Sequence, residues 1–210
     1  MSPDQQFWWN WWVQAFTALG TIGAVLVALF GQRIKALFPP RLHISLPHPL
    51  GEWCPAEIPR PDGTRFRTDS RWFHIHVENQ RRQLVPATAV QVFLQKIDEF
   101  DAAVGQWRVA WSASEVPIGW KNQNVKPPAL TIGRPDGCDL FSIIRADPPV
   151  LSLYPLVGVF SLNTEWRTAC RLLLTLQARS VETDSNILQV EITWNGRWSD
   201  DPVQLVAVNT

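Results

Sequence analysis

The sequence predicts a mainly β protein in which a single N-terminal transmembrane helix precedes an antiparallel β-sandwich domain. The first observation behind this prediction is an uncharged apolar run over residues 11–31, long enough to cross the roughly 30 Å hydrocarbon core of a bilayer. The second is the strict alternation of apolar and polar residues in several later segments, which is typical of half-buried antiparallel strands. We therefore expect a membrane anchor over residues 1–40 and a β domain over residues 41–210.

The apolar run, WWVQAFTALGTIGAVLVALFG, predicts a transmembrane helix from about residue 8 to residue 37. A secretory signal peptide is the competing interpretation, but the segment before the run carries Asp4 and no lysine or arginine, and the run is too long. A spanning anchor is therefore favoured. Tryptophans at one end and basic residues at the other suit the two membrane interfaces: Trp8, Trp9, Trp11 and Trp12, then Arg33 and Lys35.

The distribution of basic residues also predicts the orientation of the helix. Basic residues follow the helix and are absent before it, so the positive-inside rule places the N-terminus outside and the β domain in the cytoplasm. Three widely spaced cysteines without a C-x-x-C pair agree with a reducing compartment. The expected location is the cytoplasmic membrane, crossed once.

Small residues recur every four positions along the helix, at Gly20, Ala24 and Ala28. This spacing lets helix backbones approach closely in lipid. We expect the lipid bilayer and further copies of the same chain, packed along this stripe, to be partners of the helix.

The β domain is predicted from period-two alternation in five segments and from shorter β candidates between them. Residues 47–70, with five prolines, are expected to form a long first loop, and Asn195-Gly196 is expected to make a tight turn between Trp194 and Trp198. This strand count predicts an immunoglobulin-like sandwich, with a small barrel as the alternative. The five segments are 41–46, 71–78, 90–95, 171–179 and 187–194, and the shorter candidates are 106–111, 139–144, 150–154 and 157–161.

Four stretches carry a resemblance: FPPRLHISL, HVENQRRQLVPATAVQVFLQKI, GCDLFSI and VEITWNGRWSDD. With them the chain resembles poorly characterised small bacterial single-pass membrane proteins that have a C-terminal immunoglobulin-like β-sandwich. The part from Val77 to Leu94 is also similar to adhesion-type modules, in which a V-x-N strand end precedes an A-x-x-V-x-V strand. The resemblance implies a fold and no activity.

Charge and motifs limit the chemistry that we expect. The 19 basic residues balance the 19 acidic ones, which argues against a protein that coats nucleic acid. No nucleophile elbow, phosphate loop, dinucleotide motif or H-E-x-x-H occurs, so neither an enzyme nor a cofactor is expected. His43, His74 and His76 share comparable strand faces and are weak candidates for a metal site; solvated strand histidines are the favoured interpretation.

Arginines gather around the expected first loop and are the candidate ligand-binding residues. Arginine forks suit phosphate groups, so this set predicts an anion site for lipid headgroups or a phosphorylated small ligand; scattered solvated charges are the simpler interpretation. The set is Arg60, Arg65, Arg67, Arg71, Arg81 and Arg82.

Two functional hypotheses follow from the sequence. The first is a non-enzymatic, membrane-anchored interaction module that binds a protein partner. The second is a ligand-gated membrane effector, similar to those of bacterial anti-phage defence, in which the β domain senses a nucleotide signal and the helices perturb the membrane.

Overall fold

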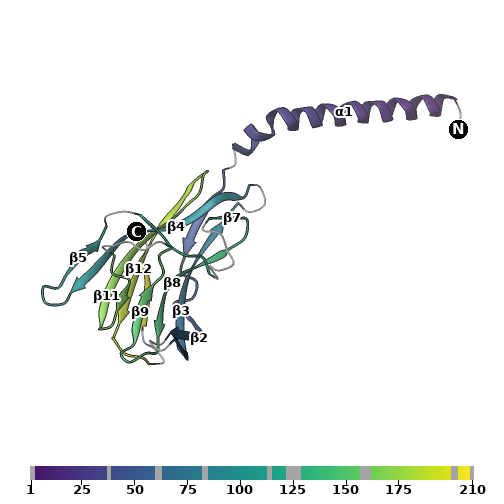
Figure 1. The fold of residues 1–210 in the computed structure, drawn as a ribbon. Helices are drawn as coiled ribbons and strands as arrows, with labels where there is room; N and C mark the ends of the chain where they lie inside the picture. Colours follow the sequence, from purple (N-terminus) through teal and green to yellow (C-terminus); the bar gives the residue numbers. More distant parts are fainter. Residues whose placement is uncertain are drawn as a thin grey trace. The chain divides into compact units, whose positions relative to one another are not determined.

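A computed structural model describes residues 3–36, 39–59, 63–81, 85–112, 115–121, 129–156, 162–199 and 203–208. The chain forms two compact units, Met1–Pro39 and Pro40–Thr210. The first contains the helix and the second contains all of the described strands (Figure 1).

The first unit is one long helix, α1, which spans Pro3–Ala36 and so begins five residues before the predicted start. Within its segment Gln5–Phe30, an 18-residue stretch has a mean hydropathy of 2.0, and none of that stretch is buried. The threonine hydroxyls donate hydrogen bonds within the helix. Thr17 donates to the Val13 carbonyl oxygen at 2.7 Å, and Thr21 donates to the Thr17 carbonyl oxygen at 2.9 Å. By length and composition this helix suits a membrane anchor, and a signal sequence passes the same test.

The second unit consists of two antiparallel sheets, one of which is a half-barrel. The six-stranded sheet has the order β1-β3-β8-β9-β10, and β2 also pairs with β3. Its strands are β1 (Leu42–Ser45), β2 (Glu52–Pro59), β3 (Arg65–Asn79), β8 (Asp136–Ile144), β9 (Val150–Leu153) and β10 (Glu165–Trp166).

The seven-stranded sheet has the order β13-β12-β11-β4-β5, with β6 and β7 also paired to β4. Figure 1 shows β5 on the outer side of this sheet, where it forms a hairpin with the end of β4. The strands are β4 (Ala87–Asp101), β5 (Gln106–Trp111), β6 (Val116–Pro117), β7 (Leu130–Ile132), β11 (Cys170–Arg179), β12 (Asp184–Trp194) and β13 (Val203–Val208).

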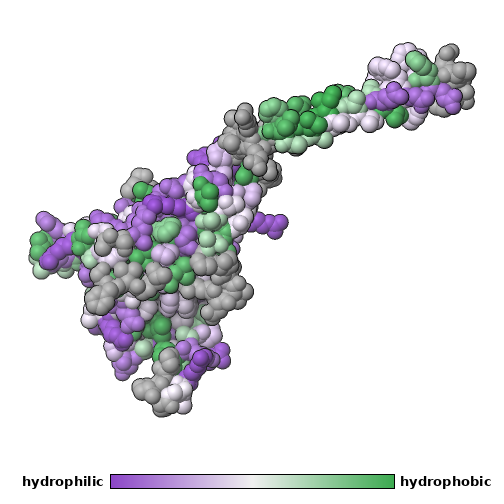
Figure 2. All heavy atoms as spheres, turned by 45° about the horizontal axis from the view of Figure 1, so that its top comes forward, coloured by the Kyte–Doolittle hydropathy of each residue, from purple (hydrophilic) through white to green (hydrophobic). Residues whose placement is uncertain are grey.

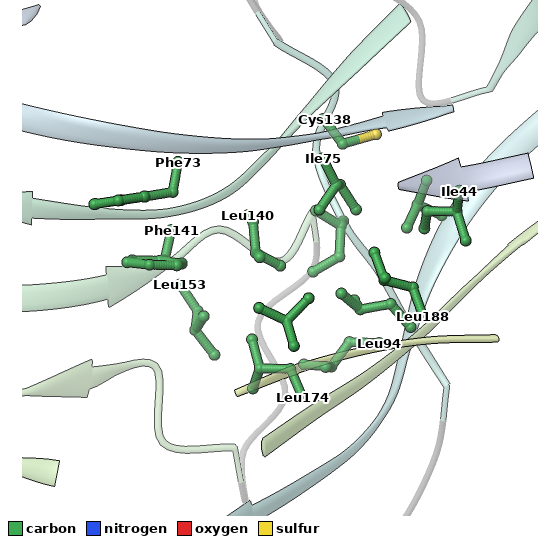
Figure 3. Close-up of a cluster of buried hydrophobic side chains, with 14 of the residues drawn as sticks. Ile44, Phe73, Ile75, Leu94, Cys138, Leu140, Phe141, Leu153, Leu174 and Leu188 are labelled. Atoms are coloured by element: carbon green, nitrogen blue, oxygen red, sulfur yellow. The ribbon is translucent and has the colours of Figure 1, made fainter. Parts of the chain in front are cut away.

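One hydrophobic core draws side chains from both sheets (Figure 3). Phe73 and Phe141 stack across β3 and β8 with ring centroids 4.4 Å apart. The seven-stranded sheet contributes the faces that alternation predicted in 171–179 and 187–194, and every residue of both faces is buried. They are Leu172, Leu174, Leu176 and Ala178 on β11, and Leu188, Val190, Ile192 and Trp194 on β12.

A short segment after β5 connects the two sheets. It pairs with β4 at Val116–Pro117, and Trp120 then forms a bridge to Cys138 on β8. Backbone bonds on either side of that bridge are short, from the Lys121 amide to the Gly137 carbonyl at 2.8 Å and from the Asp139 amide to the Gly119 carbonyl at 2.9 Å. The segment therefore ties one sheet to the other along one side of the domain.

The prediction of a long loop over residues 47–70 is wrong. The structure has a hairpin there, in which β2 pairs with the first half of β3 in an unbroken register from Glu52↔Trp72 to Pro59↔Arg65. Prolines are tolerated because β2 is an edge strand, where a missing N–H can face away from the neighbouring strand. Gly51 leads into β2 with φ +70°, and a Cβ there would lie 2.8 Å from the Phe73 ring and from the Trp72 carbonyl oxygen.

The predicted tight turn at Asn195-Gly196 is also only partly right. Gly196 has φ +75°, and the Asn195 side-chain oxygen accepts a bond from the Arg197 amide at 2.8 Å. However, the strand that pairs with the end of β12 begins at Val203 rather than at Trp198, so the connection is much longer than a two-residue hairpin. The candidate strand 157–161 lies outside the described residues.

Candidate functional site

An exposed tryptophan on β2 marks the edge of the six-stranded sheet. Trp53 keeps 54% of its surface exposed, although it points to the same side of the sheet as the core residues that follow Arg71 on β3. Its ring meets Trp198, from the connection between β12 and β13, edge-on at 5.4 Å. We call Trp53, Trp198 and Arg71 the tryptophan patch.

Buried charge fixes the position of the Trp53 ring. Arg71 pairs directly with Trp53 across the β2–β3 ladder, and its guanidinium carbon lies 5.1 Å from the centroid of the ring. Arg71 itself is only 7% exposed. A cation that is withdrawn from water and set against a tryptophan face makes a stronger contact than a solvated one. The patch therefore presents a large aromatic side chain that is already held in place.

The opposite face of β3 carries a cluster of histidines and carboxylates. His74 lies between two acids, with Nδ1 2.9 Å from Asp139 Oδ1 and Nε2 3.6 Å from Glu52 Oε2. The first pair is a close polar contact that lacks the alignment of a hydrogen bond. Lys121 Nζ then reaches the same Glu52 oxygen at 2.7 Å. Together these side chains link β2, β3, β8 and the segment that joins the sheets.

Electrostatics in this cluster favour a charged Glu52 and a neutral His76. The hydrogen bond from Lys121 lowers the pKa of Glu52. Burial lowers the pKa of His76, and the neighbouring positive groups of His48, His74 and Lys121 lower it further. The His48 and His76 rings meet edge-on at 6.1 Å.

The three histidines that were weak metal candidates do not form a ligand set. His43 is on β1 opposite Glu78, whereas His74 sits deeper in the sheet and pairs with Asp139 on β8. Within the described part of the chain, no group of three metal-ligating side chains comes together.

The arginine set is spread along β3 instead of converging. Arg65 pairs with Glu57 at 3.1 Å, Arg71 is buried in the tryptophan patch, and Arg81 lies beyond the other end of the strand. Arg60 and Arg82 lie outside the described residues. The expectation of one arginine-lined anion site is therefore not met by the four described members.

Of these four, Arg67 lines a hollow in the surface of about 440 Å³. Arg145 also lines it, but its guanidinium pairs with Asp69 at 3.2 Å and its carbonyl accepts the Thr68 hydroxyl at 2.6 Å. The acid neutralises part of the positive charge of the hollow. Its lining is Pro55, Phe66, Arg67, Thr68, Asp69 and Arg145.

The predicted membrane residues all lie on α1. The four tryptophans are between 49% and 63% exposed, and Trp8 and Trp11 pack edge-on at 6.1 Å. Gly20, Ala24 and Ala28 are exposed, and a Cβ at Gly20 would touch nothing within 4 Å among the described residues. For Arg33 and Lys35 the structure gives only the helical backbone. Figure 2 shows the hydrophobic side chains along the middle of the helix in green.

In comparisons with known proteins, no family model matches this chain, and no curated protein or solved structure matches it either. The site must therefore be interpreted from its own residues.

Sequence reasoning missed the role of the β2 residues because it assigned them to a loop. A usable signal was present in β3: Arg71 has the same parity as Phe73, Ile75 and Val77, which alternation had already placed on one face. That parity predicts an inward-facing arginine, and a buried arginine requires a partner such as an aromatic ring.

Proposed function

We propose that this chain is a non-enzymatic, membrane-anchored interaction module whose β domain binds a protein partner through the tryptophan patch. The observation that supports the proposal is the exposed Trp53 ring, held against Arg71 and Trp198. Tryptophan and arginine are the residues most enriched at the energetic centres of protein interfaces. A ring that is already positioned loses little conformational freedom when a partner covers it.

The anchor and the form of the domain belong to the same proposal. Helix α1 holds the chain in a bacterial inner membrane with the N-terminus outside, the β domain in the cytoplasm, and copies associated along Gly20, Ala24 and Ala28. The two sheets form an immunoglobulin-like sandwich. The shared core and the uncharged 26-residue segment Gln5–Phe30 of the helix support these assignments.

The ligand-gated effector is the weaker proposal. It needs a cationic site for a nucleotide signal, but the described arginines point to different places and the hollow at Arg67 contains Asp69. It would gain support if expression together with a nucleotide signal made membranes leak and Arg67→Ala abolished the leakage.

Cross-linking in cells tests the interaction module. A photoreactive residue at Leu50, which is 64% exposed and close in sequence to β2, should give an adduct with a different protein. Trp53→Ala should abolish that adduct. The matched control is a probe at Val181, which is 78% exposed between β11 and β12 and should give none. Equal adducts at both positions, or an adduct that survives Trp53→Ala, would contradict the proposal.

A further inference from the structure

The last strand, β13, leaves one side of the seven-stranded sheet unpaired. It pairs with β12 in a continuous register from Gln189↔Val208 to Trp194↔Val203, without a bulge. Among the described residues nothing pairs with its other side, since β13 ends the strand order of the sheet. Its outer N–H and C=O groups are therefore available to another strand.

The composition of β13 does nothing to prevent such pairing. The strand, VQLVAV, contains no charged residue, no proline and no glycine. Natural edge strands are normally protected by charges, prolines, bulges or a covering segment. In addition, Val206 stands 56% exposed, whereas Val203 on the other face is only 6% exposed and joins the core. The strand thus combines an open backbone with an uncovered apolar side chain.

The edge formed by β2 is protected by comparison. Pro55 and Pro59 are four residues apart and so face the same side, which deprives the outer side of β2 of two donors. Glu52 and Glu57 add negative charge to the same strand. Of these two edges, β13 is therefore the one at which another strand can be added.

We infer that β13 pairs with β13 of a second copy of this chain, antiparallel and about a two-fold axis, so that one sheet runs through both copies. Opposite residues of an antiparallel pair point to the same face, so residues of like parity must meet. Placing the axis at Val206 sets the two exposed valines against each other and pairs Gln204 with Val208. Both outward side chains of Val206 are then covered.

A second copy suits this edge better than a foreign strand for two reasons. A two-fold axis makes any antiparallel edge complementary to itself, and an uncharged strand brings no like charges together. The anchor of the proposed function also raises the local concentration of copies, so that a short strand pairing is sufficient. The inference rests on the proposed function only in this last respect.

Charge exchange at Val206 tests the pairing in the full-length chain in detergent. Val206→Lys and Val206→Glu proteins with different tags should co-purify about tenfold more when mixed with each other than Lys with Lys or Glu with Glu, because opposite charges attract across a strand pair. The domain should tolerate both changes, since the side chain is already exposed. Equal co-purification in all mixtures, whether high or low, would overturn the inference.

Val109 provides the matched control. It is 56% exposed like Val206 and lies on β5, at the other end of the same sheet. Lys and Glu variants at Val109 should show no preference for each other; the same preference there would mean attraction unrelated to β13 and would also overturn the inference. The cross-link from Leu50 should persist in Val206→Lys, so a failure of the β13 pairing and a failure of the tryptophan patch are separate results.

Discussion

The β2 edge of the six-stranded sheet and the β13 edge of the seven-stranded sheet differ in how they present their unpaired backbone groups. On β2 the backbone is blocked by Pro55 and Pro59, and the strand instead displays an aromatic side chain, Trp53. On β13 no described strand pairs with the outer side of the backbone, and the side chains are uncharged. In the account proposed above, side-chain recognition belongs to the first edge and strand addition to the second.

Thiol reactivity should show the largest contrast between the two sheets. Cys54 is exposed on β2, whereas burial, together with the charge of Glu99, raises the pKa of Cys170 at the start of β11 to about 12. An ordinary thiol has a pKa of about 8.5, so Cys170 holds roughly a thousandth of the usual thiolate at pH 8. Alkylation followed by mass spectrometry should label Cys54 fully before Cys170 reacts. Protection of Cys54 would show that the β2 edge is covered.

Gly51→Ala should strongly destabilise the β2 side. The substitution forces a Cβ to within 2.8 Å of both the Phe73 ring and the Trp72 carbonyl oxygen, at a positive φ that alanine avoids. We expect a loss of about 3 kcal/mol in the free energy of unfolding, measured by urea titration of circular dichroism. Gly63→Ala is the control, because φ is +80° there but no atom of the described residues lies within 4 Å of the added Cβ, so only about 1 kcal/mol is expected. Similar losses for the two variants would mean that the close approach at Gly51 is unimportant.

Removing the prolines should convert the β2 edge into an open one. In the double variant Pro55→Thr and Pro59→Thr, both missing donors are restored and threonine suits a strand. We expect the apparent dissociation constant for self-association to fall about tenfold, as measured by light scattering over a range of concentrations. The change should also appear in the background of Val206→Lys. An unchanged mass in both backgrounds would show that the prolines do not protect this edge.

Acid should act weakly, and only on the β2 side. Because the folded state lowers the pKa of His76, the unfolded chain binds more protons below about pH 6.5, and stability falls as the pH drops through that value. Strand β13 carries no titratable side chain. Hydrogen exchange at pH 5.5 compared with pH 7.5 should therefore quicken in β2 and β3 and stay unchanged in β13. His76→Gln should reduce the difference; an equal response of both edges would contradict this prediction.

The sequence shows the alternation of residues within a strand, but it does not show which strands lie at the edge of a sheet. Alternation in 187–194 correctly placed Leu188, Val190 and Ile192 in the core, because a period of two follows directly from strand geometry. β2 was missed because proline normally argues against a strand, and only the sheet order shows that this strand is an edge. For β13 the sequence shows the lack of charge and proline, but only the sheet order shows that one side of the strand has no described neighbour.

The arginine set shows most clearly that closeness in sequence does not predict a common site. Six arginines close together in sequence suggested one cationic site, but Arg65 and Arg71 are six residues apart along β3, which is roughly 20 Å in an extended strand. Arginines that are close in sequence therefore lie apart in the structure. The pairing of Arg71 with Trp53 and of His74 with Asp139 required knowledge of the register between strands.

Disulfide formation at Val206 compares the two edges most directly. In an antiparallel pair centred on this residue the opposing Cα atoms lie about 4.5 to 5.5 Å apart, which is within the range that a disulfide spans. The full-length variant with Val206→Cys and Cys54→Ser should form a covalent dimer on mild oxidation, at twice the 23.9 kDa of one chain. The unaltered chain, whose exposed thiol Cys54 lies on β2, should stay monomeric on the denaturing gel. A dimer through Cys54, or none through position 206, would contradict the assignment of strand addition to β13.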